Sequence, residues 1–203
     1  MIPPLIVESA LDLGINLIAI TDHNASANVR AVQEAALHTP LSVLPGMELQ
    51  TVEEVHCLCL FDKLEQLDRF QEFVSRSLPP IHNQPEHFGE QFIVDESGEF
   101  IRREDQLLIV SSNLSINQAF YTVESLGGIL IPAHVNRKAF GLIEILGFVP
   151  QDIPFDALEI SRHLTVSEAY HSFPQITPYP LLRSGDVHRL EEFLGANHFT
   201  MMA

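Results

Sequence analysis

The sequence predicts an α/β fold in which a mainly parallel sheet is flanked by helices. Short apolar runs alternate along the chain with amphipathic segments of helical period, and this alternation is typical of strand–helix units. Residues 15–21 form a nearly continuous apolar run, which predicts a strand buried on both faces. A chain of 203 residues with 46% hydrophobic content can bury one sizeable core. We therefore expect a single domain over residues 1–203.

The expected elements follow one another with short connections. Helical spacing of apolar residues predicts helices at 5–13, 25–38, 63–78 and 117–126. Apolar runs predict strands at 15–21, 41–51, 55–61, 129–133, 158–161 and 180–184. One side of the third helix carries a set of large apolar residues, namely Leu64, Leu67, Phe70, Phe73 and Val74.

A proline-rich excursion interrupts this rhythm at about residues 79–106. Pro79, Pro80 and Pro85 begin it, and residues 95–98 then read as a turn between two short apolar runs. A turn flanked in this way predicts a β-hairpin. We expect the segment to leave the main fold without forming a second domain, because it is too short to bury a core.

Composition argues against several classes of partner. Eleven Lys and Arg residues against 27 Asp and Glu residues give a net charge of −16, which repels phosphate backbones and anionic lipids. Neither a nucleic-acid coating nor binding to a membrane is therefore expected, and oligomeric state is left open. Cys57 and Cys59 would lie about 7 Å apart on one face of a strand, too far for a disulfide. Together with the lack of a basic, apolar leader, they favour a reduced cytoplasmic protein.

The main chemical signal is the kind of residue at which the apolar strands end. His23, Glu48, His134, Asp186 and His188 each lie at or just after the end of an expected strand. The carboxyl ends of strands in α/β barrels converge on one mouth. Imidazole and carboxylate are ligands that Zn, Mn and Fe accept, so the pattern predicts a divalent metal site.

His56 begins its strand instead of ending it, and a hairpin brings it to the same place. If residues 51–53 form the turn, antiparallel pairing sets Glu48 directly opposite His56. Opposed residues have Cβ atoms about 5 Å apart. Glu48 and His56 are therefore expected to hold the same ion.

In these stretches the sequence resembles the PHP (polymerase and histidinol phosphatase) superfamily of metal-dependent phosphoesterases. The matching stretches lie in family order across most of the chain, at residues 14–24, 46–48, 54–56, 131–134 and 184–188. The resemblance implies a distorted seven-stranded (β/α) barrel whose mouth holds up to three divalent ions. It also implies hydrolysis of a phosphomonoester by a metal-activated hydroxide, so the expected partner is a small phosphorylated substrate.

The resemblance assigns the ligands to three ions. Glu48 would bridge two of them, with His56 and His134 completing the second ion's ligands. Asp186 would bind the first ion, and His23 with His188 the third. Glu48, His134 and Asp186 are the expected catalytic residues.

The chain departs from the family at its start. The family opens with a strand bearing His-x-His and a further histidine, and nothing before the helix at Leu5 supplies them. We expect either that the chain begins downstream of that strand or that this homologue lacks it. In both cases the barrel lacks its first strand and two ion sites are incomplete.

Substrate contacts are expected from residues beside the ligands. Arg137, Arg162 and His163 are placed to bind phosphate oxygens, or to be solvated at the surface, and Asn24 follows His23 directly. Histidinol phosphate, a nucleotide monophosphate or an oligonucleotide end would each be compatible. The alternatives are a catalytically silent module with a degenerate metal site, and a C–N hydrolase, which would usually need a metal-bridging lysine.

Overall fold

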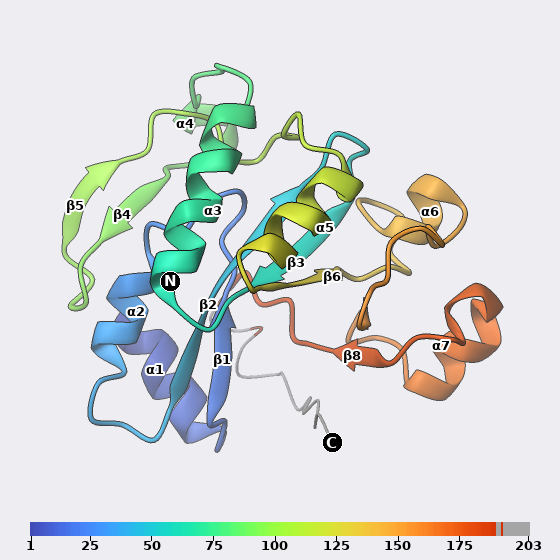
Figure 1. The fold of residues 1–203 in the computed structure, drawn as a ribbon. Helices are drawn as coiled ribbons and strands as arrows, with labels where there is room; N and C mark the ends of the chain where they lie inside the picture. Colours follow the sequence, from blue (N-terminus) through green and yellow to red (C-terminus); the bar gives the residue numbers. More distant parts are fainter. Residues whose placement is uncertain (190–191, 193–203) are drawn as a thin grey trace.

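A mixed four-stranded sheet forms the centre of the computed structural model, which describes residues 1–189 and 192 (Figure 1). Its strands, in spatial order, are β1 (Leu17–Ile20), β2 (Ser42–Gln50), β3 (His56–Leu60) and β6 (Ile129–Pro132). The first pair is parallel, and the next two pairs are antiparallel. The expectation of a mainly parallel sheet is therefore wrong for this sheet, because the β2–β3 hairpin reverses the chain.

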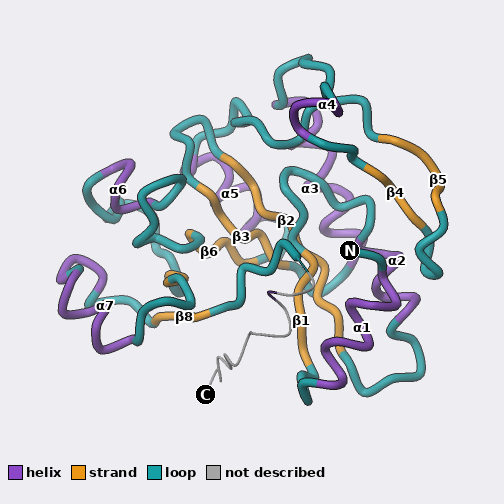
Figure 2. Tube along the Cα trace, turned by 180° about the vertical axis from the view of Figure 1, so that it is seen from behind, coloured by secondary structure: helices purple, strands orange, loops and turns teal. Residues whose placement is uncertain are grey.

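Two small sheets accompany it in the described part of the chain. β4 (Phe92–Val94) pairs antiparallel with β5 (Phe100–Arg103), which confirms the predicted hairpin, and β7 (Leu158–Ile160) pairs parallel with β8 (Leu181–Arg183). Figure 2 shows β8 with α6 and α7 at the opposite end of the molecule from β4 and β5. The sheets of the described residues are small and do not close, so the expected seven-stranded barrel is not seen.

Helices cover the sheet and join its strands. The expected helices are α1 (Pro3–Asp12), α2 (Val29–Ala35), α3 (Leu64–Ser77) and α5 (Ile116–Ser125). Short helices that the periodicity did not predict are α4 (Pro85–Phe88), α6 (Leu142–Leu146), α7 (Val166–Ser172) and a 3₁₀ turn, Pro174–Ile176. Within residues 1–189, no helix is both long and apolar enough to cross a bilayer.

The apolar side chains form two buried clusters. The larger one joins α3 and α5 to the sheet and continues to β7; the smaller lies between α1, α2 and the first two strands. In α3, Leu67, Phe70 and Val74 are buried, whereas Phe73 is 49% exposed. Phe73 was expected on the packing side, but at about 100° per residue it turns out of the stripe that its neighbours form.

β1 lies at the edge of the sheet instead of inside it. Within the described part of the chain its only strand partner is β2, and Leu17 is 51% exposed. The prediction of a strand buried on both faces is therefore wrong for β1. An apolar run does not by itself distinguish a central strand from an edge strand covered by helices on one side.

The hairpin between β2 and β3 has a longer loop than the sequence suggested. Gln50 pairs with His56, and Glu48 pairs with Leu58. The expected pairing of Glu48 with His56 is thus displaced by two residues, because Thr51 bonds to Val55 across a five-residue turn. Since strand side chains alternate with period two, this displacement leaves Glu48 and His56 on the same face.

The α3 packing predicts a sharp contrast between two phenylalanines. Replacing Phe70, which packs on the ring of Phe61 at 5.6 Å between centroids, with alanine is expected to lower the free energy of unfolding by about 3–5 kcal/mol. Phe73→Ala, in the same helix, is expected to change it by less than about 0.5 kcal/mol. Urea unfolding of both variants measures this, and equal losses would contradict the described packing.

Candidate metal centre

Four separate segments meet at one end of the central sheet. His23 follows β1 and forms a bridge to Glu48 of β2; His56 begins β3, and His134 follows β6. Because β3 runs antiparallel to β2, the start of β3 lies at the same end of the sheet as the end of β2. The predicted convergence of polar strand ends therefore occurs.

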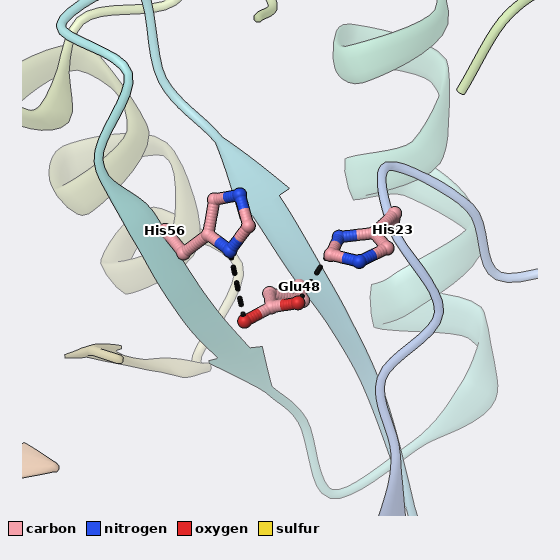
Figure 3. Close-up of side chains that lie close together, drawn as sticks. All are labelled: His23, Glu48 and His56. Carbon is pink, nitrogen blue, oxygen red and sulfur yellow. Dashed lines mark ion pairs between the residues drawn. The ribbon is translucent and has the colours of Figure 1, made fainter. Parts of the chain in front are cut away.

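The carboxylate of Glu48 lies at the centre of these side chains. Its Oε2 is 3.0 Å from His23 Nδ1, and its Oε1 is 3.2 Å from His56 Nδ1 and 3.3 Å from His134 Nε2. Figure 3 shows the rings of His23 and His56 on either side of the carboxylate. The ligand atoms of His23, Glu48 and His56 all lie within 4.8 Å of one another. This group can hold a metal ion.

A glycine permits the close approach of β1 and β2 that brings His23 to Glu48. A Cβ atom at Gly46 would lie 2.9 Å from Thr21 Cγ2 and 3.0 Å from the carbonyl oxygen of Ile20. Both contacts are shorter than packed atoms tolerate. The Gly46-Met47-Glu48 sequence thus combines the close approach with the central ligand, two residues apart on the same face.

Burial and the imidazoles act in opposite directions on Glu48. Glu48 is 5% exposed, and burial alone would raise its pKa. Hydrogen bonds from His134 and His56, with the charges of His56 and His23, outweigh burial and hold the pKa of Glu48 well below its usual range. Burial lowers the pKa of His23. The cluster therefore favours an ionised carboxylate and a neutral His23, which are the protonation states that bind metal.

The segment after β8 supplies a second group beside the first. His188 Nε2 lies 3.1 Å from Asp186 Oδ1, and Arg137 Nη1 pairs with Asp186 Oδ2. The His188 ring stacks beside that of His23, at 5.8 Å between centroids. The hydrogen bond between them lowers the pKa of Asp186 and raises that of His188. All six predicted ligand positions thus lie near one another, although His23 groups with Glu48 and His56 more closely than the resemblance implied.

Two residues that the sequence did not single out support the cluster. Glu159, in β7, is 3% exposed and accepts hydrogen bonds from the backbone N–H of His134, at 2.8 Å, and from Ser184 Oγ. Burial raises the pKa of Glu159. Phe140 stacks on His56, with 4.4 Å between centroids. The one available signal was a charged residue, Glu159, inside an apolar strand.

Asn24 does not have the substrate-binding position expected for it. Its side chain is fully buried: Nδ2 donates to the carbonyl oxygens of Leu108 and Val110, and Oδ1 accepts the N–H of Gln50. Both amide hydrogens are therefore used within the protein. Asn24 connects the loop after β1 to β2 and to the 108–110 segment, which is a structural role.

The other expected substrate contacts are more open. Arg137 is 45% exposed at its side chain, which leaves part of its guanidinium free beside Asp186. Arg162 and His163 follow β7, and the charges of Arg162 and His188 both act on Glu192. Among the described residues, neither Arg162 nor His163 contacts Glu48 or its three imidazoles directly.

The residues present fit a divalent ion. A carboxylate and neutral imidazoles form a donor set that Zn, Mn and Fe accept. His134 Nδ1 is buried and has no hydrogen-bond partner among the described residues, so this imidazole keeps one uncommitted nitrogen. This nitrogen is not the one that faces Glu48, because His134 Nε2 is the atom 3.3 Å from Oε1. An ion beside Glu48 would therefore bind Nε2, and the fit to a divalent ion rests on the donor set itself.

Comparison with solved structures identifies proteins of the same fold. The chain matches the lesion-specific endonuclease PfuEndoQ from Pyrococcus furiosus over 94% of its own length, with 20% identity and a TM-score of 0.60. It matches a proposed metal-dependent phosphoesterase from Bifidobacterium adolescentis over 93%, with 18% identity and a TM-score of 0.59. An amidohydrolase from Chromobacterium violaceum matches over 91%, with 17% identity and a TM-score of 0.56.

The chain has a PHP-like fold. The matches to the endonuclease and the phosphoesterase, which are both of PHP type, confirm the resemblance at the level of the fold. This chain covers 44% of the PfuEndoQ chain, 82% of the phosphoesterase and 80% of the amidohydrolase. No family model matches the sequence, and no curated protein matches it.

The same comparison corrects the expected partner. One matched structure, with 18% identity, a TM-score of 0.58 and 94% of this chain covered, is endonuclease Q in complex with a 27-mer duplex carrying an abasic lesion at the active site; this chain spans 45% of it. The expectation of a small phosphorylated substrate, which the resemblance implied, is therefore wrong, and the net charge was no ground for setting nucleic acid aside. A net charge describes the whole surface, whereas a phosphate chain is bound by the local charge at a site.

Removing the central charge tests the metal centre. Glu48→Gln keeps the size of the side chain but removes the anion that faces three imidazoles, so affinity for Mn²⁺ or Zn²⁺ is expected to fall by about tenfold or more. Isothermal titration measures this. Glu124→Gln, on the exposed face of α5, makes the same charge change and is expected to leave affinity unchanged. Equal affinity in both variants would remove Glu48 from the site.

The pKa shifts predict an acid-sensitive metal-free protein. Glu48 contributes stability above its ordinary pKa of 4.5, and His23 above 6.5; both contributions are lost as the pH falls. His188, with a raised pKa, acts oppositely because its contribution is lost as the pH rises. With a chelator present, the melting temperature is expected to fall as the pH decreases from about 7 to about 2, first through His23 and then, below about pH 4.5, through Glu48.

Two variants separate the contributions of His23 and Glu48 to this pH dependence. His23→Gln is expected to flatten its upper part and Glu48→Gln its lower part. Circular-dichroism melts across the range measure both. A melting temperature that is independent of pH in the wild-type chain would contradict the described electrostatics.

Proposed function

We propose that the chain is a metal-dependent hydrolase that cleaves phosphodiester bonds in nucleic acid. The observation that carries this is the Glu48 carboxylate among three imidazoles, with Asp186 and His188 beside it. The fold is shared with a lesion-specific endonuclease and a proposed metal-dependent phosphoesterase. These similarities support a hydrolase of phosphate esters, and the endonuclease structures favour nucleic acid as its substrate.

The ion would be held by Glu48 with His23, His56 and His134, and a second ion by Asp186 and His188. A divalent ion supplies a Lewis acid that lowers the pKa of water and neutralises charge on a phosphoryl group. The protein's own contribution is orientation. Phe140 excludes water from one face of His56, and the depressed pKa of Glu48 keeps a full negative charge facing the imidazoles.

Arg137 would connect the metal centre to the substrate. In the structure it pairs with Asp186 and remains partly exposed. A guanidinium has five donors, so it can contact Asp186 and a phosphate oxygen together. Arg162 and His163, after the neighbouring strand, would contact the chain of phosphates farther from the scissile bond.

Two alternatives lead to different outcomes. A silent module would bind a metal or a partner without turnover. A C–N hydrolase would usually need a bridging lysine, and the described cluster of His23, Glu48, His56 and His134 contains none. The observed donors therefore favour phosphate chemistry over the second alternative.

A substrate panel tests the proposal. With Mn²⁺ or Zn²⁺ added, the chain is expected to cleave a labelled duplex bearing one abasic site or an undamaged strand, and a chelator should abolish cleavage. His56→Ala and His134→Ala are expected to lower the rate by about 100-fold or more, because even the loss of an outer partner of a ligand costs about 10- to 100-fold. Glu124→Gln is the control.

Three results would contradict the proposal. Turnover of p-nitrophenyl phosphate without cleavage of any nucleic acid would point to a phosphomonoesterase. Metal binding with no turnover would indicate the silent module. Cleavage that survives both histidine substitutions would place the activity elsewhere.

A further inference from the structure

One buried carboxylate connects the two halves of the candidate metal centre. Glu159 Oε2 accepts the backbone N–H of His134 at 2.8 Å, and Oε1 accepts the hydroxyl of Ser184. His134 belongs to the cluster around Glu48, whereas Ser184 lies two residues before Asp186. A single side chain in β7 therefore contacts both ligand-bearing segments.

We propose that Glu159 is the positioning residue that fixes His134 and the 184–188 segment relative to each other. The effect of this positioning on metal binding rests on the proposed function, whereas its effect on the backbone of His134 and of the 184–188 segment does not. Glu159 would touch neither metal nor substrate. It would act through His134 on one side and through Asp186 on the other.

Both connected segments contain a residue in an unusual backbone conformation. His134 has φ of 30° and Asp186 has φ of 44°, in the left-handed region that residues other than glycine rarely adopt. Such conformations persist when the surroundings fix them. Three further bonds hold the turn at His134: Val135 N–H to the Glu159 carbonyl, Arg137 N–H to the His134 carbonyl, and Ile143 N–H to the Val135 carbonyl.

The chemistry of the site explains why a side chain with two hydrogen-bonding atoms is needed at position 159. A backbone N–H and a hydroxyl approach Glu159 from different segments, and each forms a hydrogen bond to one of its oxygens. A buried carboxylate is tolerated when its oxygens are hydrogen-bonded, and both oxygens of Glu159 are. Alanine at this position would leave the buried N–H of His134 without its partner, and the turn would lose a constraint.

Glutamine provides a conservative rescue. Its Oε1 can accept from His134 N–H, while its Nε2 can donate to Ser184 Oγ, which is also an acceptor. Glu159→Gln therefore keeps both contacts and removes only the charge. Glu159→Ala removes both contacts. The difference between the two variants isolates positioning from charge.

The first measurement needs no metal. In the metal-free protein, ¹⁵N-resolved amide exchange at His134 is expected to be slow in the wild type and in Glu159→Gln, and about tenfold or more faster in Glu159→Ala, because the amide has lost its acceptor. Ser184→Ala is expected to leave the His134 amide protected but to shift the resonances of Asp186 and His188. Should Glu159→Ala not fold, Ser184→Ala still tests the link.

The second measurement is divalent affinity by isothermal titration with Mn²⁺. Glu159→Ala is expected to bind about 10- to 100-fold more weakly, and Glu159→Gln within about threefold of wild type. Asp95→Ala is the control, because the Asp95 carboxylate also accepts backbone N–H groups, those of Ser97 and Glu99, but in the turn between β4 and β5, outside the metal centre. It is expected to lower the melting temperature without changing affinity.

The outcomes separate this proposal from the proposed function. If the wild type binds Mn²⁺ but Glu159→Ala binds equally well and keeps its His134 amide protected, the positioning role is overturned. Unchanged Asp186 and His188 resonances in Ser184→Ala would also overturn it. If the wild type binds no divalent ion, the proposed function fails, and the metal-free amide measurement still decides the role of Glu159.

Discussion

The burial of the Glu48 carboxylate is the constraint on which the candidate site depends. An ionised carboxylate at 5% exposure is stable only when donors or cations surround it. Here the partners come from three other segments, so β1, β3 and β6 must all deliver a histidine to the same point on β2. Gly46, the five-residue turn before His56 and the stacked ring of Phe140 each serve this requirement. In this region, the packing contacts that stabilise the fold therefore also set the geometry of the site.

The sequence could predict which side chains gather because the periodicity of a strand is robust to small errors. The expected register of β2 and β3 was wrong by two residues, yet Glu48 and His56 remain on one face because a shift of two preserves the alternation. A shift of one would have turned His56 away from Glu48. The helical period likewise located the long helices to within a few residues at each end, apart from α2. Phe73 was assigned to the wrong side of α3 because the rotation of about 100° per residue turns it away from the stripe of Leu67, Phe70 and Val74.

Other features depend on contacts that periodicity does not contain. Whether a sheet closes is decided by pairings between distant segments, and an apolar run such as 15–21 reads the same at an edge as in the centre. Glu159 lies in the middle of a short buried strand, whereas the sequence argument considered only the polar residues at strand ends. The role of Glu159 follows from its hydrogen bonds to His134 and Ser184, each 25 residues away in the sequence. Helix α7, by contrast, could have been predicted from the sequence, since Thr165 and Glu168 form a capping box at its start.

The net charge was a poor argument against nucleic acid because charge acts locally. At physiological ionic strength, exposed charges are screened beyond about 8 Å, so the excess of 27 acidic over 11 basic residues is a poor measure of the charge that a ligand meets at the sheet's end. The site itself combines the carboxylates of Glu48 and Asp186 with Arg137 and the histidines. Each divalent ion held there would add two positive charges in a partly buried environment, where they are screened much less. A phosphate chain would therefore meet a site whose charge is set by metal occupancy, and the acidic remainder of the surface would act mainly on the rate of its approach.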